Sequence, residues 1–294
     1  MSPAKRTPAG VSPIDPAPEL ADDVCALPLA RRLAAMLDRD PSALRNGDPL
    51  PRGWHVMLFN TPTPQSRLRH DGAAGLGVTL PELGLPRLML GGRQIRFDGD
   101  IAIGAPVRRE SRQQGVQVKE GRSGRFALVK VEHRIFVADA AEPAVVEVQD
   151  YVLRAASPAA PGSPSQDTAP PAPAAPIAEA LEPDVRITIV PDAPLLFRYS
   201  AITDNPHRIH YDQPYATGTE GYPSLVVNGS IPAMFLLELF RSRAGREPVG
   251  ITSRNVAPMF CGRPLHLNAR HEGASWRLWA EDVQGGTTFD ARAE

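Results

Sequence analysis

Apolar and polar residues alternate between Leu128 and Phe136, where Lys130, Glu132 and Arg134 separate the apolar positions. This period of two is typical of a β-strand with one buried face. Several nearby segments have strand-like composition as well, so the pattern predicts a long antiparallel sheet in the first half of the chain. The expected strands are residues 53–60, 93–99, 107–121, 125–138 and 144–154.

A helix is expected before these strands, over residues 24–40. Asp23 can cap its first turn, because a short polar side chain accepts a hydrogen bond from an unpaired backbone N–H there. Pro28 suits the first turn of a helix and not its interior, so the regular part should begin near Pro28.

The second half repeats this order of helix and then strands. Residues 231–245 predict a helix that is apolar on nearly every face from Ile231 to Phe240, with Pro232 in its first turn and Gly245 at its end. Such a helix must be buried. Expected strands follow at residues 250–258, 264–272, 275–282 and 287–293, with a hairpin at residues 285–286.

Two segments rich in proline, alanine and serine divide the chain. Residues 1–20 form a leader, and residues 155–182 form a linker with little charge and no aromatic residue. Such segments cannot bury enough apolar surface to offset the entropy lost on ordering, so both are expected to be disordered. The sequence therefore predicts two α+β halves, residues 21–154 and 183–294.

Charge and cysteine content exclude several classes of partner. The 294 residues carry 32 basic and 33 acidic side chains, a formal net charge of −1, so nucleic acid and anionic membranes are not expected to bind. No signal-peptide-like run and no membrane span is present, which predicts a cytoplasmic protein. Cys25 and Cys261 lie far apart without further ligands nearby, so neither a metal site nor a disulfide is predicted.

A cluster of polar residues follows a strand-like opening at Phe197. Asn205, His207, His210 and Asp212 fall within one short loop and could supply an acid/base group, its orienting partners and a holder for water. The Asp-Asn-Pro part of this loop is also ordinary turn chemistry, because Asn and Asp cap their own backbone and Pro fixes φ.

The segment from residue 197 to residue 212 resembles the signature of the MaoC-like enoyl-CoA hydratases, in which an aromatic residue precedes Asp-x-Asn-Pro-(Ile/Leu)-His-x-Asp. Tyr199 matches the aromatic position and is a candidate substrate-binding residue, and Asn205 stands where that family has its catalytic Asp. The form Asn-x-His-Arg-Ile-His-Tyr-Asp is closer to the hydroxyacyl-thioester dehydratase type 2 and mesaconyl-CoA (itaconyl-CoA) hydratase branch. Asp204 and Asn228 depart from the residues common in relatives.

The resemblance covers about residues 21–291 without the linker, and it implies a fold. Residues 221–240 are similar to the family's entry into the long helix of a hotdog, and residues 88–97, 119–125 and 145–154 resemble the first half of the same branch. The expected architecture is a double hotdog, two long antiparallel sheets each wrapped around a central helix. The expected enzyme is a hydratase or dehydratase, a carbon–oxygen lyase.

The same resemblance implies roles for individual residues. His210 would carry the proton, since an imidazole accepts and donates near neutral pH, and Asn205 would position the water. If a carboxylate is needed, Asp204 and then Asp212 are the candidates, although Asp212 could equally cap the following helix. The thioester oxygen would meet backbone N–H groups where residues 228–230 enter the helix, principally Gly229 with Ser230 and Asn228.

Three arginines are candidate contacts for the substrate. Arg122 could bind a phosphate of coenzyme A, although its Gly-Arg-Ser-Gly context also suits a plain hairpin. Arg93 and Arg208 could receive a second carboxylate on the acyl group, whereas surface ion pairing is the commoner role of arginine. Coenzyme A enters as part of the substrate, no other cofactor is expected, and a homodimer is the predicted assembly.

The predicted reaction is reversible addition of water to a short enoyl-CoA, of the mesaconyl or itaconyl type. A (3R)-hydroxyacyl-thioester dehydratase for longer unfunctionalised chains is the alternative enzyme. A hotdog that binds acyl thioesters without turnover is the alternative of another class, because Asn205 and Asn228 replace ionisable groups. A buried cation near the end of the tunnel would favour the dicarboxylyl substrate, and an all-apolar tunnel the longer chain.

Overall fold

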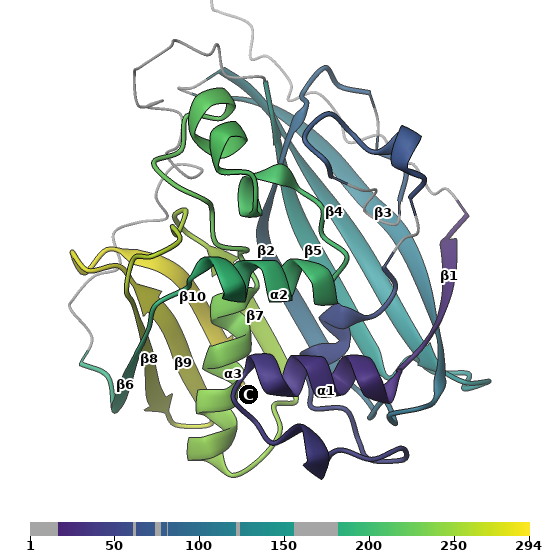
Figure 1. Ribbon diagram of the computed structural model, residues 1–294. Helices are drawn as coiled ribbons and strands as arrows, with labels where there is room; N and C mark the ends of the chain where they lie inside the picture. Colours follow the sequence, from purple (N-terminus) through teal and green to yellow (C-terminus); the bar gives the residue numbers. More distant parts are fainter. Residues whose placement is uncertain (1–16, 61–62, 74–77, 81, 122–123, 156–181) are drawn as a thin grey trace, which may run out of the picture.

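The computed structural model describes residues 17–60, 63–73, 78–80, 82–121, 124–155 and 182–294. Their strands form one antiparallel sheet in the order β1-β3-β4-β5-β2-β7-β10-β9-β8-β6. Figure 1 shows the helices gathered on one face of this sheet. The strands are β1 (Glu19–Val24), β2 (Arg87–Phe97), β3 (Pro106–Gly121), β4 (Gly124–Val137), β5 (Val145–Arg154), β6 (Val185–Ile189), β7 (Gly250–Asn255), β8 (Leu265–Glu272), β9 (Ser275–Glu281) and β10 (Thr287–Ala293).

The two halves of the chain join through the pairing of β2 with β7. This antiparallel ladder runs from Gly92 opposite Arg254 to Arg96 opposite Gly250. The first half contributes β1 to β5 and the second half β6 to β10, so the two predicted sheets are edge-to-edge parts of a single one. The predicted α+β double hotdog is confirmed in this continuous form.

The alternating pattern in the first half predicts its strands well. Residues 127, 129, 131, 133 and 135 of β4 are all buried, whereas Lys130 and Arg134 are exposed. The strand expected over residues 53–60 is wrong, because residues 54–57 form the 3₁₀-helix η2 (Trp54–Met57). Three of its four side chains are buried, so this short apolar run had no exposed face to mark it as a strand.

In the described part of the chain, three α-helices cover the sheet, α1 (Leu27–Met36), α2 (Ala193–Ile202) and α3 (Ile231–Ala244). Pro28 lies in the first turn of α1 as expected, but Asp23 does not cap it. Asp23 belongs to β1, and its carboxylate accepts from the Phe59 N–H at 2.6 Å. The predicted helix at residues 231–245 is confirmed, with Gly245 in the left-handed conformation at its end.

The strand-like opening expected at Phe197 is wrong, because this residue lies in the middle of α2. The Asp192 carboxylate caps the helix by accepting from the Leu195 N–H at 2.9 Å, and Pro194 occupies its first turn. These helix signals lie upstream of the motif itself. The shorter helices are η1 (Pro41–Ala43), η3 (Gln65–Arg67), η5 (Arg208–His210) and the π-helix η6 (Tyr215–Thr219).

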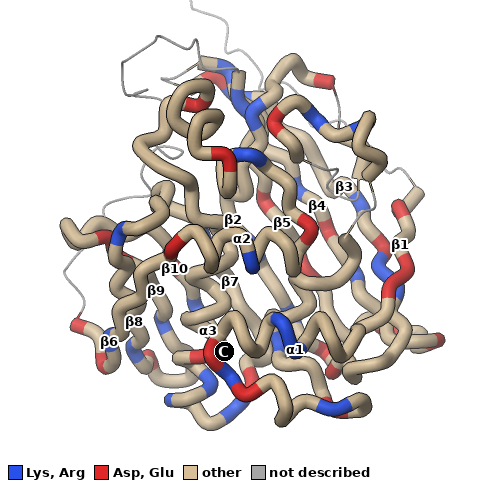
Figure 2. The backbone as a smooth tube through the Cα atoms, in the orientation of Figure 1, with Lys and Arg blue, Asp and Glu red and all other residues tan. Residues whose placement is uncertain are grey.

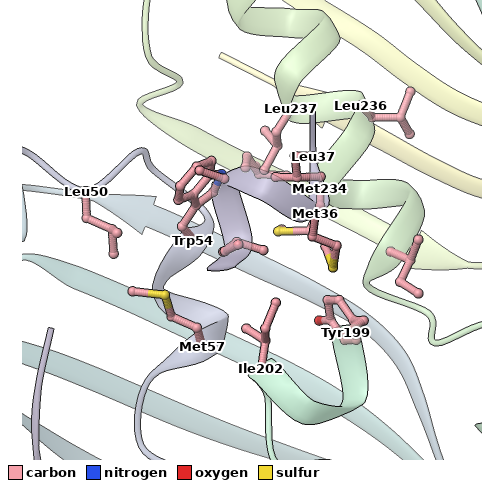
Figure 3. Close-up of a cluster of buried hydrophobic side chains, with 14 of the residues drawn as sticks. Met36, Leu37, Leu50, Trp54, Met57, Tyr199, Ile202, Met234, Leu236 and Leu237 are labelled. Carbon is pink, nitrogen blue, oxygen red and sulfur yellow. The ribbon is translucent and has the colours of Figure 1, made fainter. Parts of the chain in front are cut away.

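One hydrophobic core is shared by both halves. Figure 3 shows Trp54 and Met57 of η2 beside Ile202 of α2 and Met234 and Leu237 of α3, and all five are buried. The predicted division at residues 21–154 and 183–294 therefore separates segments of chain that bury a common interior. The predicted linker lies almost wholly outside the described residues, as does the leader up to residue 16, while β1 already begins within the leader's last two residues.

Charged residues of both signs are interspersed over the molecule in the view of Figure 2, in line with the small net charge. No helix in the described part of the chain is long and apolar enough to cross a membrane.

Candidate active site

Hydrogen bonds of Asn205 to the end of α2 and to the following residues fix the polar loop after α2. The Asn205 N–H donates to the Ser200 carbonyl at 2.9 Å, and the Asn205 Oδ1 accepts from the His207 N–H at 3.1 Å. Asp204 adopts a positive φ of 44°, which turns the chain out of the helix. The loop then continues into η5, which carries His210 inward.

His210 is buried, with 7% of its surface exposed. Its Nδ1 lies 2.8 Å from the Val226 carbonyl, which can only accept, so Nδ1 carries the proton and Nε2 is left as an acceptor. Burial lowers the pKa of His210 to about 4, against the opposing effect of the Val226 hydrogen bond. The imidazole is therefore neutral at pH 7 and able to take a proton.

The entry into α3 supplies backbone donors. The Ser230 N–H donates to the Asn228 Oδ1 at 3.3 Å, and the Ile231 N–H donates to the Asn228 carbonyl at 2.9 Å. The Gly229 N–H has no partner within the described residues. It is thus the donor best placed to meet an oxyanion, at the positive end of a buried helix. The glycine also has a packing role, since a Cβ there would lie 2.9 Å from the Asn255 side chain.

Two adjoining cavities bring these groups together. The first, about 340 Å³, is lined by His210, Gly229 and apolar residues of β2, and we call it the tunnel. The second, about 300 Å³, lies against the polar inner face of β2, β4 and β5, and we call it the acyl cavity. Asn205 and Asn228 line both cavities. The residues that border both are Leu88, Arg93, Tyr151, Asn205, His207, Asn228 and Ser230.

Charged residues form part of the acyl cavity, and the sequence analysis identified Arg93 and Asp204 among them but not Arg109 or Glu147. The sheet register aligns Glu147 of β5 with His133 of β4, and Arg109 of β3 also faces the cavity. His55 of η2 completes the set, with its Nε2 3.0 Å from the Glu147 Oε2. One signal in the sequence could have identified residues 133 and 147. Each is a charged or imidazole residue at a position of an alternating strand where an apolar, inward-facing residue is expected.

The comparisons with known proteins identify the family. A model of the hydroxyacyl-thioester dehydratase type 2 family matches residues 53–261. The chain belongs to this family. It is 39% identical over 276 residues to mesaconyl-C(4)-CoA hydratase of Chloroflexus aurantiacus, covering 94% of each chain. It is also 35% identical over 89 residues to the mitochondrial hydroxyacyl-thioester dehydratase type 2 of Schizosaccharomyces pombe, covering 29% of this chain and 30% of the other.

Solved structures show the same fold at low identity. HtdX of Mycobacterium tuberculosis aligns with a TM-score of 0.63 and 17% identity, over 93% of this chain and 98% of that one. A MaoC-like dehydratase of Phytophthora capsici gives 0.67 and 14%, over 96% and 95%. A Mycobacterium tuberculosis protein described as a double hotdog gives 0.57 and 14%, over 98% and 96%. The predicted family, fold and enzyme class are confirmed.

Several predicted site residues of this dehydratase-family chain meet at the two cavities, while their catalytic roles stay predictions. Asn205, His210, Gly229, Ser230 and Asn228 converge as described above. Tyr199 joins them, because it lines the acyl cavity from α2, and burial raises the pKa of its hydroxyl.

The other candidates do not converge with them. The Asp212 carboxylate accepts from the Arg208 guanidinium at 2.8 Å and from the Tyr215 N–H at 3.1 Å, so Asp212 caps the following turn. Arg208 is held by this pair and lies over the Tyr215 ring, which removes it as a carboxylate receptor. Asp204 is exposed at the rim of the acyl cavity, and Arg122 lies outside the described residues.

A loop of the first half supports the polar loop that follows α2. The Asp71 carbonyl accepts from the Arg208 N–H at 2.8 Å, and the Asp71 carboxylate lies 4.0 Å from the His207 Nε2. Gly72 adopts φ +81°, and a Cβ there would collide with the Pro206 carbonyl oxygen. The first half therefore holds the motif of the second half in place through backbone contacts that only glycine permits at this position.

Gly72→Ala should lower turnover by about tenfold or more, because displacement of the Pro206 backbone would misplace Asn205 and His210. Gly47→Ala is the matched control, since Gly47 has φ +91° but no atom lies within 4 Å of the point that an alanine Cβ would occupy. Steady-state rates of the two variants with one enoyl-CoA separate the collision from the cost of the left-handed conformation. Equal activities would contradict the supporting role of the loop.

Two buried neutral imidazoles should make the fold sensitive to acid. Burial lowers the pKa of both His133 and His210 to about 4, whereas unfolded histidine titrates near 6.5. The unfolded chain therefore binds more protons between these values, so stability should fall as the pH drops from about 6.5 towards 4. Urea midpoints measured between pH 6.5 and pH 4 should decline less steeply in His133→Gln than in the wild type. The control His271→Gln changes an exposed histidine and should keep the wild-type decline. The same decline in both variants would contradict the assignment.

Proposed function

We propose that this chain reversibly hydrates a short branched enoyl-CoA bearing a second carboxylate, of the mesaconyl or itaconyl type. The observation that carries the reaction is the neutral His210, whose Nδ1 is tied to the Val226 carbonyl while the ring borders the same tunnel as the Gly229 N–H. Similarity to mesaconyl-C(4)-CoA hydratase over 94% of the chain supports the substrate class.

The geometry supports a simple sequence of proton transfers. With a substrate of the mesaconyl type, whose double bond is conjugated to the thioester, the His210 Nε2 takes a proton from water as the water oxygen bonds to Cβ. The electron pair of the double bond moves towards the thioester oxygen, where the Gly229 N–H and the α3 N-terminus stabilise the developing enolate charge. The His210 imidazolium then returns its proton to Cα, which restores the neutral base and adds one water in all.

Asn205 fits the role of water holder. Its Oδ1 is engaged by the His207 N–H at 3.1 Å, so the Nδ2 donor is the part of the amide available to a water in the cavities. An amide cannot exchange a proton in this reaction, so the proton chemistry falls to His210.

The acyl cavity favours a short functionalised substrate over a long alkyl chain. A pocket for an unfunctionalised chain would be lined by apolar side chains, whereas this one contains Arg93, Arg109 and Glu147. Burial of an alkyl chain beside these groups would strip them of solvent without replacing its hydrogen bonds.

A thioesterase activity finds little support. It would need a carboxylate on α3, and Glu238 is the acidic residue of that helix. Its carboxylate accepts from the Arg241 guanidinium at 2.6 Å and from the Trp54 Nε1 at 3.2 Å, away from both cavities.

The homodimer and the cytoplasmic location stay predictions.

Mass spectrometry tests the proposal directly. Purified protein is incubated with mesaconyl-CoA, itaconyl-CoA, crotonyl-CoA and a ten-carbon 2-enoyl-CoA, and each acyl-CoA is examined for the gain of one water, with His210→Ala as the control. Hydration of the dicarboxylyl substrates in preference to the others is expected. A preference for the ten-carbon chain would favour the fatty-acyl alternative, and no water gained on any substrate would favour the non-catalytic one.

A further inference from the structure

Two arginines line the acyl cavity with unsatisfied donors. The Nε atoms of Arg93 on β2 and Arg109 on β3 are buried, and neither has a hydrogen-bond partner among the described residues. A buried N–H of a charged group left without an acceptor is strongly unfavourable. Their placement on the wall of one cavity leaves both donors open to an acceptor that enters that cavity.

The resident carboxylate does not supply that acceptor. The Glu147 Oε2 lies 3.0 Å from the His55 Nε2, and its Oε1 accepts from the Gln149 amide at 2.7 Å. An ionised carboxylate only accepts, so His55 donates here. The Arg93 Nε lies 3.4 Å from the Glu147 Oε1, close enough for an ion pair but outside hydrogen-bonding geometry.

The buried charges of the cavity do not balance. Arg93 and the hydrogen bond from His55 hold the pKa of Glu147 well below its usual range despite its burial, so this carboxylate is ionised. His133 is neutral at pH 7, because burial lowers its pKa to about 4. Asp204 also borders the cavity, but it is exposed and screened by solvent. Among the buried side chains that line the cavity, Arg93 and Arg109 face a single carboxylate, Glu147, while Glu19 and Asp23 of β1 act on Arg109 without lining the cavity.

The geometry points to a subsite for the free carboxylate of the acyl group, in which Arg93 binds the carboxylate, Arg109 adds the second positive charge and Glu147 is a fixed counter-charge. This inference rests on the proposed function for its substrate class. Arg93 is the direct ligand because it borders both the acyl cavity and the tunnel that contains Gly229. The main chain of a mesaconyl or itaconyl group is short, with both carboxyl carbons on a chain of about four carbons, so the free carboxylate must bind close to the thioester.

Such a subsite favours acyl groups that carry a free carboxylate over acyl groups that lack one. One carboxylate balances the buried charges that line the cavity and provides acceptors for the unsatisfied arginine donors. A neutral acyl group of the same length leaves those donors unpaired after water has been displaced, which is the arrangement that gives strong discrimination in enzymes. Arg93 is therefore a specificity-determining residue and not a catalytic one.

Binding of two unreactive ligands tests the subsite independently of turnover. Dissociation constants of succinyl-CoA, which has a free carboxylate, and of butyryl-CoA, which does not, are measured for the wild type by calorimetry. Charge-assisted hydrogen bonds predict a preference for succinyl-CoA of about tenfold to a hundredfold. The double variant Arg93→Met/Glu147→Gln removes one charge of each sign, so no unpaired carboxylate remains, and its preference should fall to about threefold or less.

Two further variants sharpen the result. Arg96→Met changes an exposed arginine on the same strand and should keep the full preference. Arg109→Gln keeps the Arg93–Glu147 pair but removes one positive charge, so it should also lower the preference for succinyl-CoA. If the double variant fails to bind butyryl-CoA, the result for Arg109→Gln is the one that tests the subsite. A wild type with no preference, or a preference unchanged in both cavity variants, overturns the subsite. Failure to hydrate any enoyl-CoA would instead defeat the proposed function.

Discussion

Replacement of His210 by alanine should lower kcat by about two to four orders of magnitude, the usual contribution of a general acid/base. The expectation rests on its single free ring nitrogen, since the Nδ1 is occupied by the Val226 carbonyl at 2.8 Å and only Nε2 can exchange a proton with water. Butyryl-CoA should still bind, because the tunnel and the Gly229 N–H are unchanged. Steady-state hydration rates and calorimetry on the same preparation measure both effects.

The pH profile of the wild type checks the same assignment. A base whose pKa is lowered to about 4 is neutral throughout the neutral range, so kcat/KM should stay level down to about pH 5 and fall below it. A variant that keeps more than a tenth of wild-type turnover would remove His210 from the mechanism.

Asn205→Ala should reduce turnover by about tenfold to a hundredfold, because the variant loses both the water donor and the acceptor that holds the His207 N–H. Asn205→Asp keeps the acceptor, so the loop should keep its shape and much of its activity, with a new ionisation in the pH profile. Rates against pH for the two variants, beside thermal melts, separate loss of the water holder from loss of the loop.

Asp204→Asn completes that series and should leave turnover unchanged. Asp204 is exposed at the rim of the acyl cavity, so its carboxylate is poorly placed to be a hidden acid/base. Damage as severe as that of His210→Ala would transfer the proton chemistry to Asp204, and an Asn205→Ala enzyme equal to the wild type would remove Asn205 from water positioning.

The strands and the catalytic motif could be predicted from local sequence because both are local patterns. The alternation in β4 and the buried helix at residues 231–245 each describe one element and its own faces. The strand prediction was wrong at residues 54–57, because an apolar run four residues long has no distinguishing period. The opening at Phe197 failed because the helix cap at Asp192 and the first-turn Pro194 lie outside the motif.

The charged wall of the acyl cavity could not be predicted because it is assembled from distant parts of the chain. His55 and Glu147 are 92 residues apart and meet only when η2 packs onto the inner face of the sheet. Arg93 and Arg208 looked equivalent as candidate receptors. Arg208 has its partner four residues along the chain in Asp212, whereas the environment of Arg93 depends on the register of two other strands.

The seam between β2 and β7 has a consequence for how the two halves can diverge. Its ladder consists of main-chain hydrogen bonds, which every residue except proline can make, and the Asn255 amide adds a side-chain bond to the Leu90 carbonyl at 3.0 Å. Gly92 is restricted to glycine, because a Cβ there would lie 2.6 Å from the Ser253 carbonyl oxygen. Because main-chain bonds carry most of the join, the half with the charged cavity wall and the half with the proposed proton-handling loop and helix could change their side chains separately.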